Sequence, residues 1–362
     1  MFPPFTSIIQ AIPATVPFVG PETLERRSGR QIELRLGANE SPFGPSELAV
    51  AAMQAQANQA QFYGDPECYL LRSRLSDHLE IPLSHISVGA GIDELLAVCC
   101  RLFVSPGDSI VTSLGSYPTF EFGGVACGAQ FLRVPYRDEA PDLDRLLEVV
   151  KSTQAKILYL ANPDNPSGAF ASADAIGELV GKLPPSCMLF LDEAYIDFAP
   201  EVPPIADDNP QVIRFRTFSK AHGLAGMRVG YVMTATSHVE ALDKIRMHFG
   251  VNKLGQAGAL ASLDDAAHVA NVVQQTNLGR IEIVHLMKSL GLRTLPSHTN
   301  FVTIDVESKT RAEKLLSLLL DQGVFIRKPG MPPLDGCIRV TIGHPEQRAR
   351  FAEIFESVLP TL

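Results

Sequence analysis

From about His85 onward, short apolar runs alternate with segments of helical periodicity. The apolar runs lie at residues 86–88, 109–112, 130–134, 156–160, 188–191, 212–215 and 229–233. Helical patterns separate several of them, at residues 92–103, 142–151 and 172–182. Strands that are apolar throughout are typical of a sheet buried on both faces, and strands that alternate with helices are typical of a parallel sheet. We therefore predict a largely parallel α/β architecture.

The pattern changes after about residue 251. We expect a helical stretch at 253–290, then a strand of alternating pattern at 300–306 and a leucine-rich helix that ends at Gly323. Strands at 324–327 and 337–342 and a final helix from Pro345 follow. Such a mixture is typical of a compact α+β unit. The chain is therefore predicted to have three parts: an N-terminal arm (residues 1–36), a large domain (37–250) and a small C-terminal domain (251–362).

Composition narrows the class of protein. The 362 residues are 46% hydrophobic and 20% charged, and the formal net charge is −9. This composition is ordinary for a globular enzyme with a sizeable core. Lysine and arginine form no block, so a nucleic-acid partner is not expected.

The six cysteines are scattered and form no CxxC pair. They favour a reduced, cytoplasmic compartment over a disulfide framework, and they give no metal-ligand spacing. The N-terminal 18 residues lack a basic region and are broken by prolines, so we do not expect a signal peptide. No apolar run approaches the roughly 18 residues that a membrane helix needs, and no membrane partner is expected.

One polar turn stands out between two strands, within residues 214–231. It carries Thr217, Ser219 and Lys220 and reaches Arg228 across two glycines. A lysine among hydroxyl groups and cations can lose its proton and bind a carbonyl cofactor covalently, while its neighbours hold an anion. Most lysines are instead solvated surface groups, and that alternative stays open for this turn alone.

Two other loops follow predicted strands. Gly91, Ile92 and Asp93 lead into a helix N-terminus, where free N–H groups can bind phosphate, although an ordinary tight turn explains them too. The glycines do not match GxGxxG, so a dinucleotide site is not supported. Asn165 lies in a loop stiffened by two prolines, residues 162–168, which turn chemistry alone would also explain.

Two further side chains could serve an aromatic ligand. Asp192 directly follows an apolar strand, where a carboxylate must be solvated, paired or functional. Opposite a protonated ring nitrogen it would keep that nitrogen charged. Tyr117, also after a strand, could lie flat on a ring, although core packing is the more common role of a lone tyrosine.

Together these residues fit one cofactor, pyridoxal 5'-phosphate. It requires a lysine for its aldehyde, a carboxylate for its ring nitrogen, a side chain stacked on its ring and a cradle for its phosphate. Lys220, Asp192, Tyr117 and the loop at Gly91 supply one residue type for each requirement, and Asn165 can add a donor.

Three stretches also resemble a known family. They are residues 162–168, 191–198 and 217–228, with weaker similarity from Asn39-Glu-Ser-Pro to the segment that begins at Cys337. In these stretches the chain resembles a fold-type I pyridoxal-phosphate-dependent aminotransferase of class I/II, most similar to the histidinol-phosphate aminotransferase branch. The resemblance implies the type I fold, a place in amino-acid biosynthesis and a ping-pong exchange of an amino group with a 2-oxo acid.

The resemblance also implies roles for single residues. Lys220 would bind the cofactor covalently and Asp192 would pair with its ring nitrogen. Asn165 and Tyr195 would hydrogen-bond the ring hydroxyl, and Tyr117 would stack on the ring. The remaining cofactor contacts would be made mostly to the phosphate, by Gly91, Ile92, Asp93, Thr217, Ser219 and Arg228.

Other implied roles concern the substrate and a partner. Tyr63 matches a tyrosine that reaches the cofactor across a dimer interface, which implies a homodimer with shared active sites. Arg339, Arg327 and Asn39 match substrate-binding positions. Two residues depart from the family pattern. Ile92 stands where a small or polar residue is frequent, and Phe18 replaces a tyrosine that helps to bind substrate phosphate.

Rival functions remain open at this point. Within the same enzyme class they are an aromatic amino acid aminotransferase and an amino-acid-phosphate decarboxylase, which would use the same cofactor site. From another class, a regulator could sense ligands through such a domain, but residues 1–36 are too short and proline-rich for a helix-turn-helix module. A silent binding protein would not need so complete a set of catalytic residues.

Overall fold

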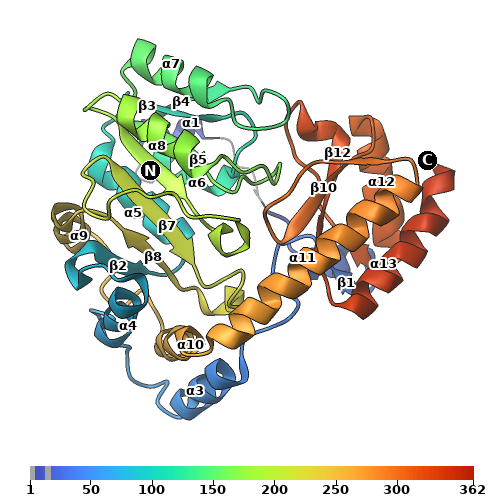
Figure 1. Cartoon of the computed structure of the whole chain (residues 1–362), viewed down its shortest axis with the longest axis horizontal. Helices are drawn as coiled ribbons and strands as arrows, with labels where there is room; N and C mark the ends of the chain where they lie inside the picture. The colour runs from blue at the N-terminus through green and yellow to red at the C-terminus, as the bar shows by residue number, and fades with distance from the viewer. Residues whose placement is uncertain (1–4, 13–17) are drawn as a thin grey trace.

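The computed structural model describes residues 5–12 and 18–362. Its centre is a seven-stranded sheet of order β2-β8-β7-β6-β5-β3-β4 (Figure 1). Its strands are β2 (Ile86–Gly89), β3 (Ser109–Ser113), β4 (Gln130–Val134), β5 (Ile157–Ala161), β6 (Met188–Asp192), β7 (Val212–Thr217) and β8 (Gly230–Met233). Six of these strands run in the same direction, and β8 runs opposite to them. The predicted α/β fold with a mostly parallel sheet is confirmed.

Helices cover both faces of this sheet, as its apolar strands require. Alternate residues of each strand enter different cores: Tyr159 of β5 packs with α5, α6 and α9, whereas Leu158 packs with α7 and α8. The helices of the large layer are α3 (Glu47–Ala57), α4 (Tyr69–Leu79), α5 (Ile92–Phe103), α6 (Pro118–Ala126), α7 (Leu143–Thr153), α8 (Ala173–Lys182) and α9 (Thr236–Asp243). Two-sided burial explains why the strands read as continuous apolar runs.

A second, smaller unit lies at the C-terminal end of the chain (Figure 1). Its antiparallel sheet has the order β12-β10-β9, and helices α11, α12 and α13 pack on it. The elements are β9 (Arg293–Thr294), β10 (Phe301–Asp305), β12 (Cys337–Thr341), α11 (Ala266–Ser289), α12 (Lys309–Asp321) and α13 (Pro345–Val358). This C-terminal unit thus has the expected α+β architecture.

The predicted helical stretch at 253–290 is two helices. Helix α10 (Lys253–Leu263) ends at Asp264, and Asp265 begins α11 by accepting a hydrogen bond from the backbone N–H of His268. An aspartate at an N-cap satisfies N–H groups that a continuous helix would bond internally. The two adjacent aspartates therefore divide the stretch.

Two segments pack across the predicted domain boundaries. Strand β1 (Leu34–Arg35) pairs in parallel with β11 (Val324–Phe325), so the end of the predicted arm lies in the C-terminal unit. Helix α10 packs on α3 and α4, and its Ala259 and Leu263 belong to a core of the large unit. Short helices α1 (Ser7–Ala11) and α2 (Pro21–Ser28) precede β1. The three-part division itself stays a prediction.

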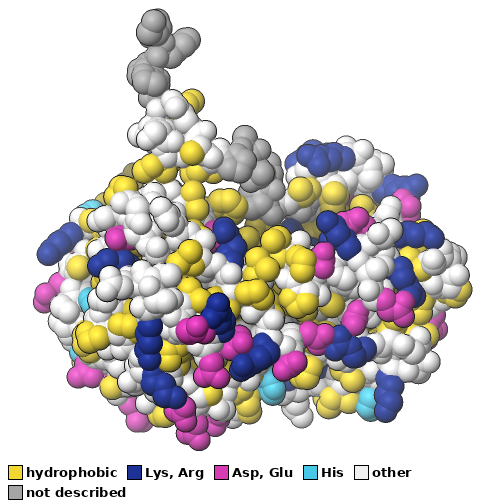
Figure 2. Space-filling model, turned by 90° about the horizontal axis from the view of Figure 1, so that it is seen from above, with side chains coloured by type: hydrophobic (Ala, Val, Ile, Leu, Met, Phe, Trp, Pro, Cys, Tyr) yellow, Lys and Arg dark blue, Asp and Glu magenta, His cyan; other side chains and the backbone are white. Residues whose placement is uncertain are grey.

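Surface and cysteine chemistry agree with the composition. On the face seen in Figure 2, basic and acidic side chains are interspersed over the surface. All six cysteines are free thiols. Within residues 5–12 and 18–362, no helix is long and apolar enough to cross a membrane, and no group of side chains has the make-up of a metal site.

Candidate active site

The site lies where five strands of the large sheet end. Strands β2, β3, β5, β6 and β7 point in the same direction, so their following loops meet at one edge of the sheet. Open α/β sheets bind ligands at this edge. The loops supply Gly91–Asp93, Tyr117, Asn165, Tyr195 and Lys220.

Two adjoining cavities open at this edge. The inner one has a volume of about 240 Å³ and the outer one about 660 Å³. Five residues line both: Ala38, Tyr117, Asn165, Tyr195 and Lys220. The inner cavity is also lined by the predicted cofactor residues Ile92, Asp93, Asp192, Thr217, Ser219 and Arg228. The structure therefore brings together residues from widely separated parts of the sequence.

Asp192 lies buried at the end of β6, beside the inner cavity. Its carboxylate accepts hydrogen bonds from the hydroxyl of Tyr159 (2.7 Å) and from the backbone N–H of Ala194 (2.9 Å). Burial raises the pKa of Asp192 to about 6, although both hydrogen bonds act in the opposite direction. A buried carboxylate whose charge is this costly favours a cationic partner in the cavity.

Lys220 lies between the two cavities. Its Nζ donates a hydrogen bond to the backbone oxygen of Asn39 (2.9 Å) and lies 5.5 Å from the ring centre of Tyr195. Burial, together with the charge of Arg339, lowers the pKa of Lys220 to about 8. An amine with such a pKa is partly deprotonated near neutral pH and can act as a nucleophile or base.

Hydroxyl, guanidinium and backbone groups gather at the other end of the inner cavity. The hydroxyl of Thr217 donates to that of Ser219 (2.9 Å), and Arg228 pairs with Asp93 (3.2 Å). Gly91 caps α5 with φ of +86°, and a Cβ there would lie 2.5 Å from Nη2 of Arg228. Glycine is thus required twice, for the backbone conformation and for the guanidinium beside it.

Ile92 and Tyr117 complete the wall of the inner cavity. Ile92 is the first residue of α5, and its side chain is buried in the core below the sheet. The hydroxyl of Tyr117 donates to Asp93 (2.9 Å). Burial and the charge of Asp93 raise the pKa of Tyr117, so its hydroxyl stays protonated. Ile92 has no polar side-chain atom, unlike the polar residues that are frequent at this position in the family. The hydrogen-bond donors that this turn can offer to a phosphate near Ile92 are therefore the backbone N–H groups at the start of α5.

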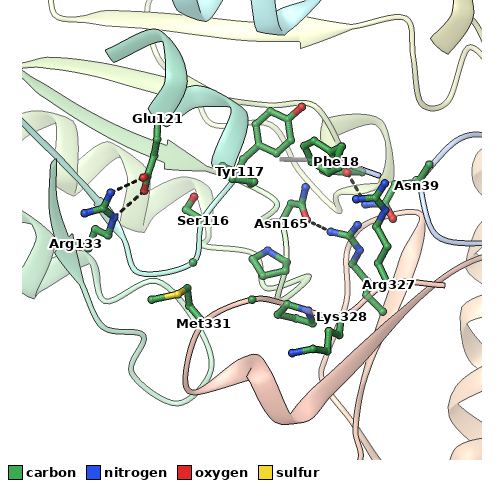
Figure 3. A pocket seen from close by; sticks show the side chains of 18 of the residues that line it. Phe18, Asn39, Ser116, Tyr117, Glu121, Arg133, Asn165, Arg327, Lys328 and Met331 are labelled. Atoms are coloured by element: carbon green, nitrogen blue, oxygen red, sulfur yellow. Dashed lines mark hydrogen bonds and ion pairs between the residues drawn. The ribbon is translucent and has the colours of Figure 1, made fainter. Parts of the chain in front are cut away.

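Two arginines of the smaller unit face the outer cavity. Arg339 donates to Oδ1 of Asn165 (Figure 3). Arg327 donates to the backbone oxygen of Val19 (3.0 Å). The guanidinium of Arg327 lies 4.6 Å from the ring centre of Phe18. The Nε atoms of both arginines are buried and have no hydrogen-bond partner among the described residues. Phe18 is described, but residues 16 and 17, which directly precede it and which also resemble the family's N-terminal arm, lie outside the described residues.

Asn39 joins the two units at the site. It is buried in the left-handed conformation (φ 54°), and its Nδ2 donates to the hydroxyl of Tyr195 (2.8 Å). From the smaller unit, Asn300 donates to the backbone oxygen of Asn39 (3.0 Å), and Thr341 accepts from its backbone N–H (3.1 Å). Asn39 therefore holds Tyr195 and Lys220 in register with the smaller unit.

Tyr63 is the one predicted site residue that lies away from both cavities. Its side chain is 79% exposed and stacks on Phe249, with ring centres 4.6 Å apart. Phe62 and Phe249 are exposed beside it, at 59% and 51%. Within one chain, the structure does not bring Tyr63 to the cofactor residues.

Two buried networks that support the site were missed from the sequence. Glu193 lies directly after Asp192 and pairs with Arg214 and Arg216. Although burial alone would raise the pKa of Glu193, the two guanidinium groups hold it below its ordinary value. The arginines at 214 and 216, on one predicted apolar strand, and the acid pair Asp192-Glu193, at the end of another, were the available signal, because buried charges need partners.

The second missed network fixes the loop that carries Asn165. Asp164 is buried and accepts hydrogen bonds from the hydroxyls of Tyr136 (3.0 Å) and Ser167 (2.6 Å). Burial raises its pKa to about 6. No local pattern pointed to Tyr136, which is 28 residues away from Asp164 along the chain.

Comparison with known proteins identifies the family. The chain matches aminotransferase class I and II over residues 31–355. It belongs to this family. The chain is 33% identical to histidinol-phosphate aminotransferase of Bacillus subtilis (strain 168) over 344 residues, which is 93% of this chain and 95% of the relative. It is 34% identical over 340 residues to histidinol-phosphate aminotransferase 1 of Idiomarina loihiensis, 92% of each chain.

Solved structures agree with this assignment. The structure of histidinol-phosphate aminotransferase from Sinorhizobium meliloti in complex with pyridoxal-5'-phosphate is 40% identical, covers 99% of both chains and gives a TM-score of 0.94. An aspartate aminotransferase variant of Thermus thermophilus, 20% identical over 99% of this chain, shares the fold with a TM-score of 0.80. The predicted type I fold and membership of the pyridoxal-phosphate-dependent aminotransferases are confirmed.

The environment of Lys220 predicts an unusually reactive amine. In the cofactor-free protein, the rate at which an amine-acylating reagent modifies Lys220 should rise with pH with a midpoint near 8, well below the roughly 10.4 of an ordinary lysine. Arg339→Gln should move this midpoint upward, because it removes a positive charge that disfavours the ammonium form. Peptide mass spectrometry of samples labelled between pH 6 and 11 measures both midpoints.

Arg145→Gln is the control, since Arg145 lies on an exposed part of α7. A midpoint at the ordinary lysine value in the unsubstituted protein, or no difference between it and Arg339→Gln, would contradict this account of the site.

Proposed function

We propose that this protein is a pyridoxal-phosphate-dependent aminotransferase most like histidinol-phosphate aminotransferase. It would move an amino group between an amino acid or amino-alcohol phosphate and a 2-oxo acid by a ping-pong mechanism. The observation that carries the proposal is the placement of Lys220 and Asp192 on one cavity of about 240 Å³. An amine of lowered pKa and a buried carboxylate are what this cofactor needs at its two ends.

The inner cavity suits pyridoxal phosphate in three further respects. Ser219, Arg228 and the N-terminus of α5 gather positive charge and N–H donors for a phosphate. Asp192 would pair with the ring nitrogen and Tyr117 would cover the ring. Asn165 and Tyr195 would donate hydrogen bonds to the ring hydroxyl. Thr217 would support Ser219 through their hydrogen bond.

Each side chain then has a defined task in the reaction. When bound, pyridoxal phosphate withdraws electrons from the amino-bearing carbon of the substrate, which no side chain can do. Nζ of Lys220 would accept the proton that leaves this carbon, as general base, and would then donate it, as general acid, to the carbon on the other side of the transferred nitrogen. Asp192, already ionised, stabilises positive charge at the far side of the cavity throughout. Burial of the site strengthens both effects.

Arginine chemistry indicates the substrate class. Arg327 and Arg339 face the outer cavity with unpaired Nε atoms and form no ion pair with an acidic side chain among the described residues. Two neighbouring guanidinium groups suit a carboxylate or phosphate. Asn39 would support the substrate by fixing Tyr195. Relatives named histidinol-phosphate aminotransferase favour a phosphorylated amino alcohol over an aromatic amino acid.

We also propose a cytoplasmic homodimer with shared active sites. The exposed aromatic side chains of Phe62, Tyr63 and Phe249 form a surface that a second copy would cover, because exposed apolar patches mark interfaces. In such a dimer Tyr63 would reach the cofactor of the partner subunit. Six free thiols support the cytoplasm as the compartment.

Removal of the proposed nucleophile tests the function itself. Lys220→Ala should reduce transamination by at least about 10³-fold, because the variant lacks both the covalent attachment and the proton carrier. The visible absorbance of the bound cofactor should change at the same time. Two further assays separate an aminotransferase from a decarboxylase: the first forms the keto product from histidinol phosphate and 2-oxoglutarate, and the second releases carbon dioxide from a phosphorylated amino acid that retains its carboxyl group.

Lys151→Ala, at an exposed position of α7, serves as the control and should keep full activity. Transamination at the unsubstituted rate by Lys220→Ala would remove the basis of the proposal.

A pair of glycine substitutions tests the phosphate cradle. Gly91→Ala should weaken cofactor binding at least about tenfold, because the new methyl group displaces Arg228 from its place against the turn. Gly107→Ala is the matched control: it has a similar φ of +92° but nothing within 4 Å of the new Cβ. Both variants bear the same backbone strain, so equal losses of cofactor affinity in a fluorescence titration would rule out the cradle.

Mixed dimers test the role of Tyr63. Lys220→Ala and Tyr63→Ala chains, co-expressed with different tags and purified as a heterodimer, should recover about half of the activity of the unsubstituted dimer. One site then combines Lys220 from one chain with Tyr63 from the other and is intact. Activity no higher than that of the Tyr63→Ala homodimer, or a monomer by light scattering, would speak against shared sites.

A further inference from the structure

The outer cavity has two chemically different ends (Figure 3). One end holds Arg327 and Arg339 beside Asn165, and the opposite end holds the ion pair of Glu121 with Arg133. The cavity of about 660 Å³ is much larger than an anion-binding site requires. A substrate bound by the arginines would therefore have room to extend toward a second polar surface.

Glu121 is placed to meet such a substrate. It lies in the first turn of α6, four residues after Tyr117, and residues four apart lie on the same side of a helix. Both side chains line the outer cavity, so Glu121 continues the wall that Tyr117 begins. Among the described residues that line this cavity, Glu121 is the one carboxylate, and Arg133 is the cation that it contacts.

Arg133 fixes the orientation of this carboxylate. Its Nε and Nη2 donate to the two carboxylate oxygens at 2.9 and 2.5 Å, in a bidentate arrangement. A carboxylate offers about four lone-pair positions, so each oxygen of Glu121 can accept a further hydrogen bond. The side chains of Glu121 and Arg133 are 23% and 39% exposed, and ion pairs this exposed contribute little to stability. Folding alone thus gives little reason for an acid in a cationic cavity.

We propose that Glu121 is a specificity-determining residue that accepts an N–H of the substrate's side chain at the end of the cavity opposite Arg327 and Arg339. The substrate class is then an amino compound with an anionic group at one end and an N–H-bearing ring, such as imidazole, at the other. Met331, which lies against Gly115 at the rim, would cover the ring between the two ends. This inference rests on the proposed function.

Two substrates that differ only in the ring test it. The intact enzyme is assayed with histidinol phosphate and with phenylalaninol phosphate, which share the anion but not the ring N–H. Glu121→Ala should lower kcat/KM for histidinol phosphate about 10- to 100-fold, the value of a hydrogen bond to a charged group. The value for phenylalaninol phosphate should stay within about twofold. Arg133→Gln keeps the carboxylate and should preserve most of the preference.

Each outcome decides a different claim. An equal fall for both substrates in Glu121→Ala would make Glu121 a structural residue, and no change for either would exclude the contact. In both cases continued transamination leaves the proposed function standing. Glu121→Gln retains one acceptor oxygen and should recover part of the preference for histidinol phosphate. The inference would also be overturned if Glu121→Gln recovered none of this preference and Arg133→Gln lost as much of it as Glu121→Ala.

Discussion

The burial of one amine and one carboxylate in the same cavity is the constraint on which this structure depends. In water, Lys220 would be an ammonium ion and Asp192 an ordinary solvated carboxylate. Removal of that water brings their pKa values to about 8 and about 6. Desolvating the two groups costs free energy, which other interactions of the fold must offset. Burial of apolar side chains on both faces of the sheet contributes stabilising free energy, and Tyr159 and Ala194 hydrogen-bond the carboxylate.

Contacts between the two units place these groups relative to the substrate. Asn39 links Tyr195 and Lys220 of the large sheet with Asn300 and Thr341 of the smaller unit. Arg339 reaches from the smaller unit to Asn165. A substrate anion bound at Arg339, as proposed, would therefore be one hydrogen bond away from Asn165 of the inner cavity, and movement of one unit against the other would change both cavities together.

The sequence allowed the sheet and most of the site to be predicted for a physical reason. Strands buried on both faces must be apolar, so polar residues at their ends, such as Asp192 and Lys220, were conspicuous. Pairings between distant segments have no such local signature. Tertiary packing determines the strand β1 and the Tyr136–Asp164 contact. A single helix cap, at Asp265, determines the division of the long helical stretch.

Tyr63 shows a related limit. A side chain whose function requires a second copy of the chain has an ordinary solvent-exposed position in one copy, so neither local pattern nor single-chain geometry identifies it. Only the resemblance to the family singled it out, and its role stays a prediction.

The pairing of β1 with β11 has a consequence for biosynthesis of the chain. Leu34 finds its partner Val324 only after the segment up to β11 has left the ribosome. Until then the seven-stranded sheet can form, but the segment that carries Asn39 has no C-terminal unit to dock on. Contacts of such large sequence separation form late and slowly. The contacts that the smaller unit makes with Asn39, beside Lys220, can therefore form only once that unit has been synthesised.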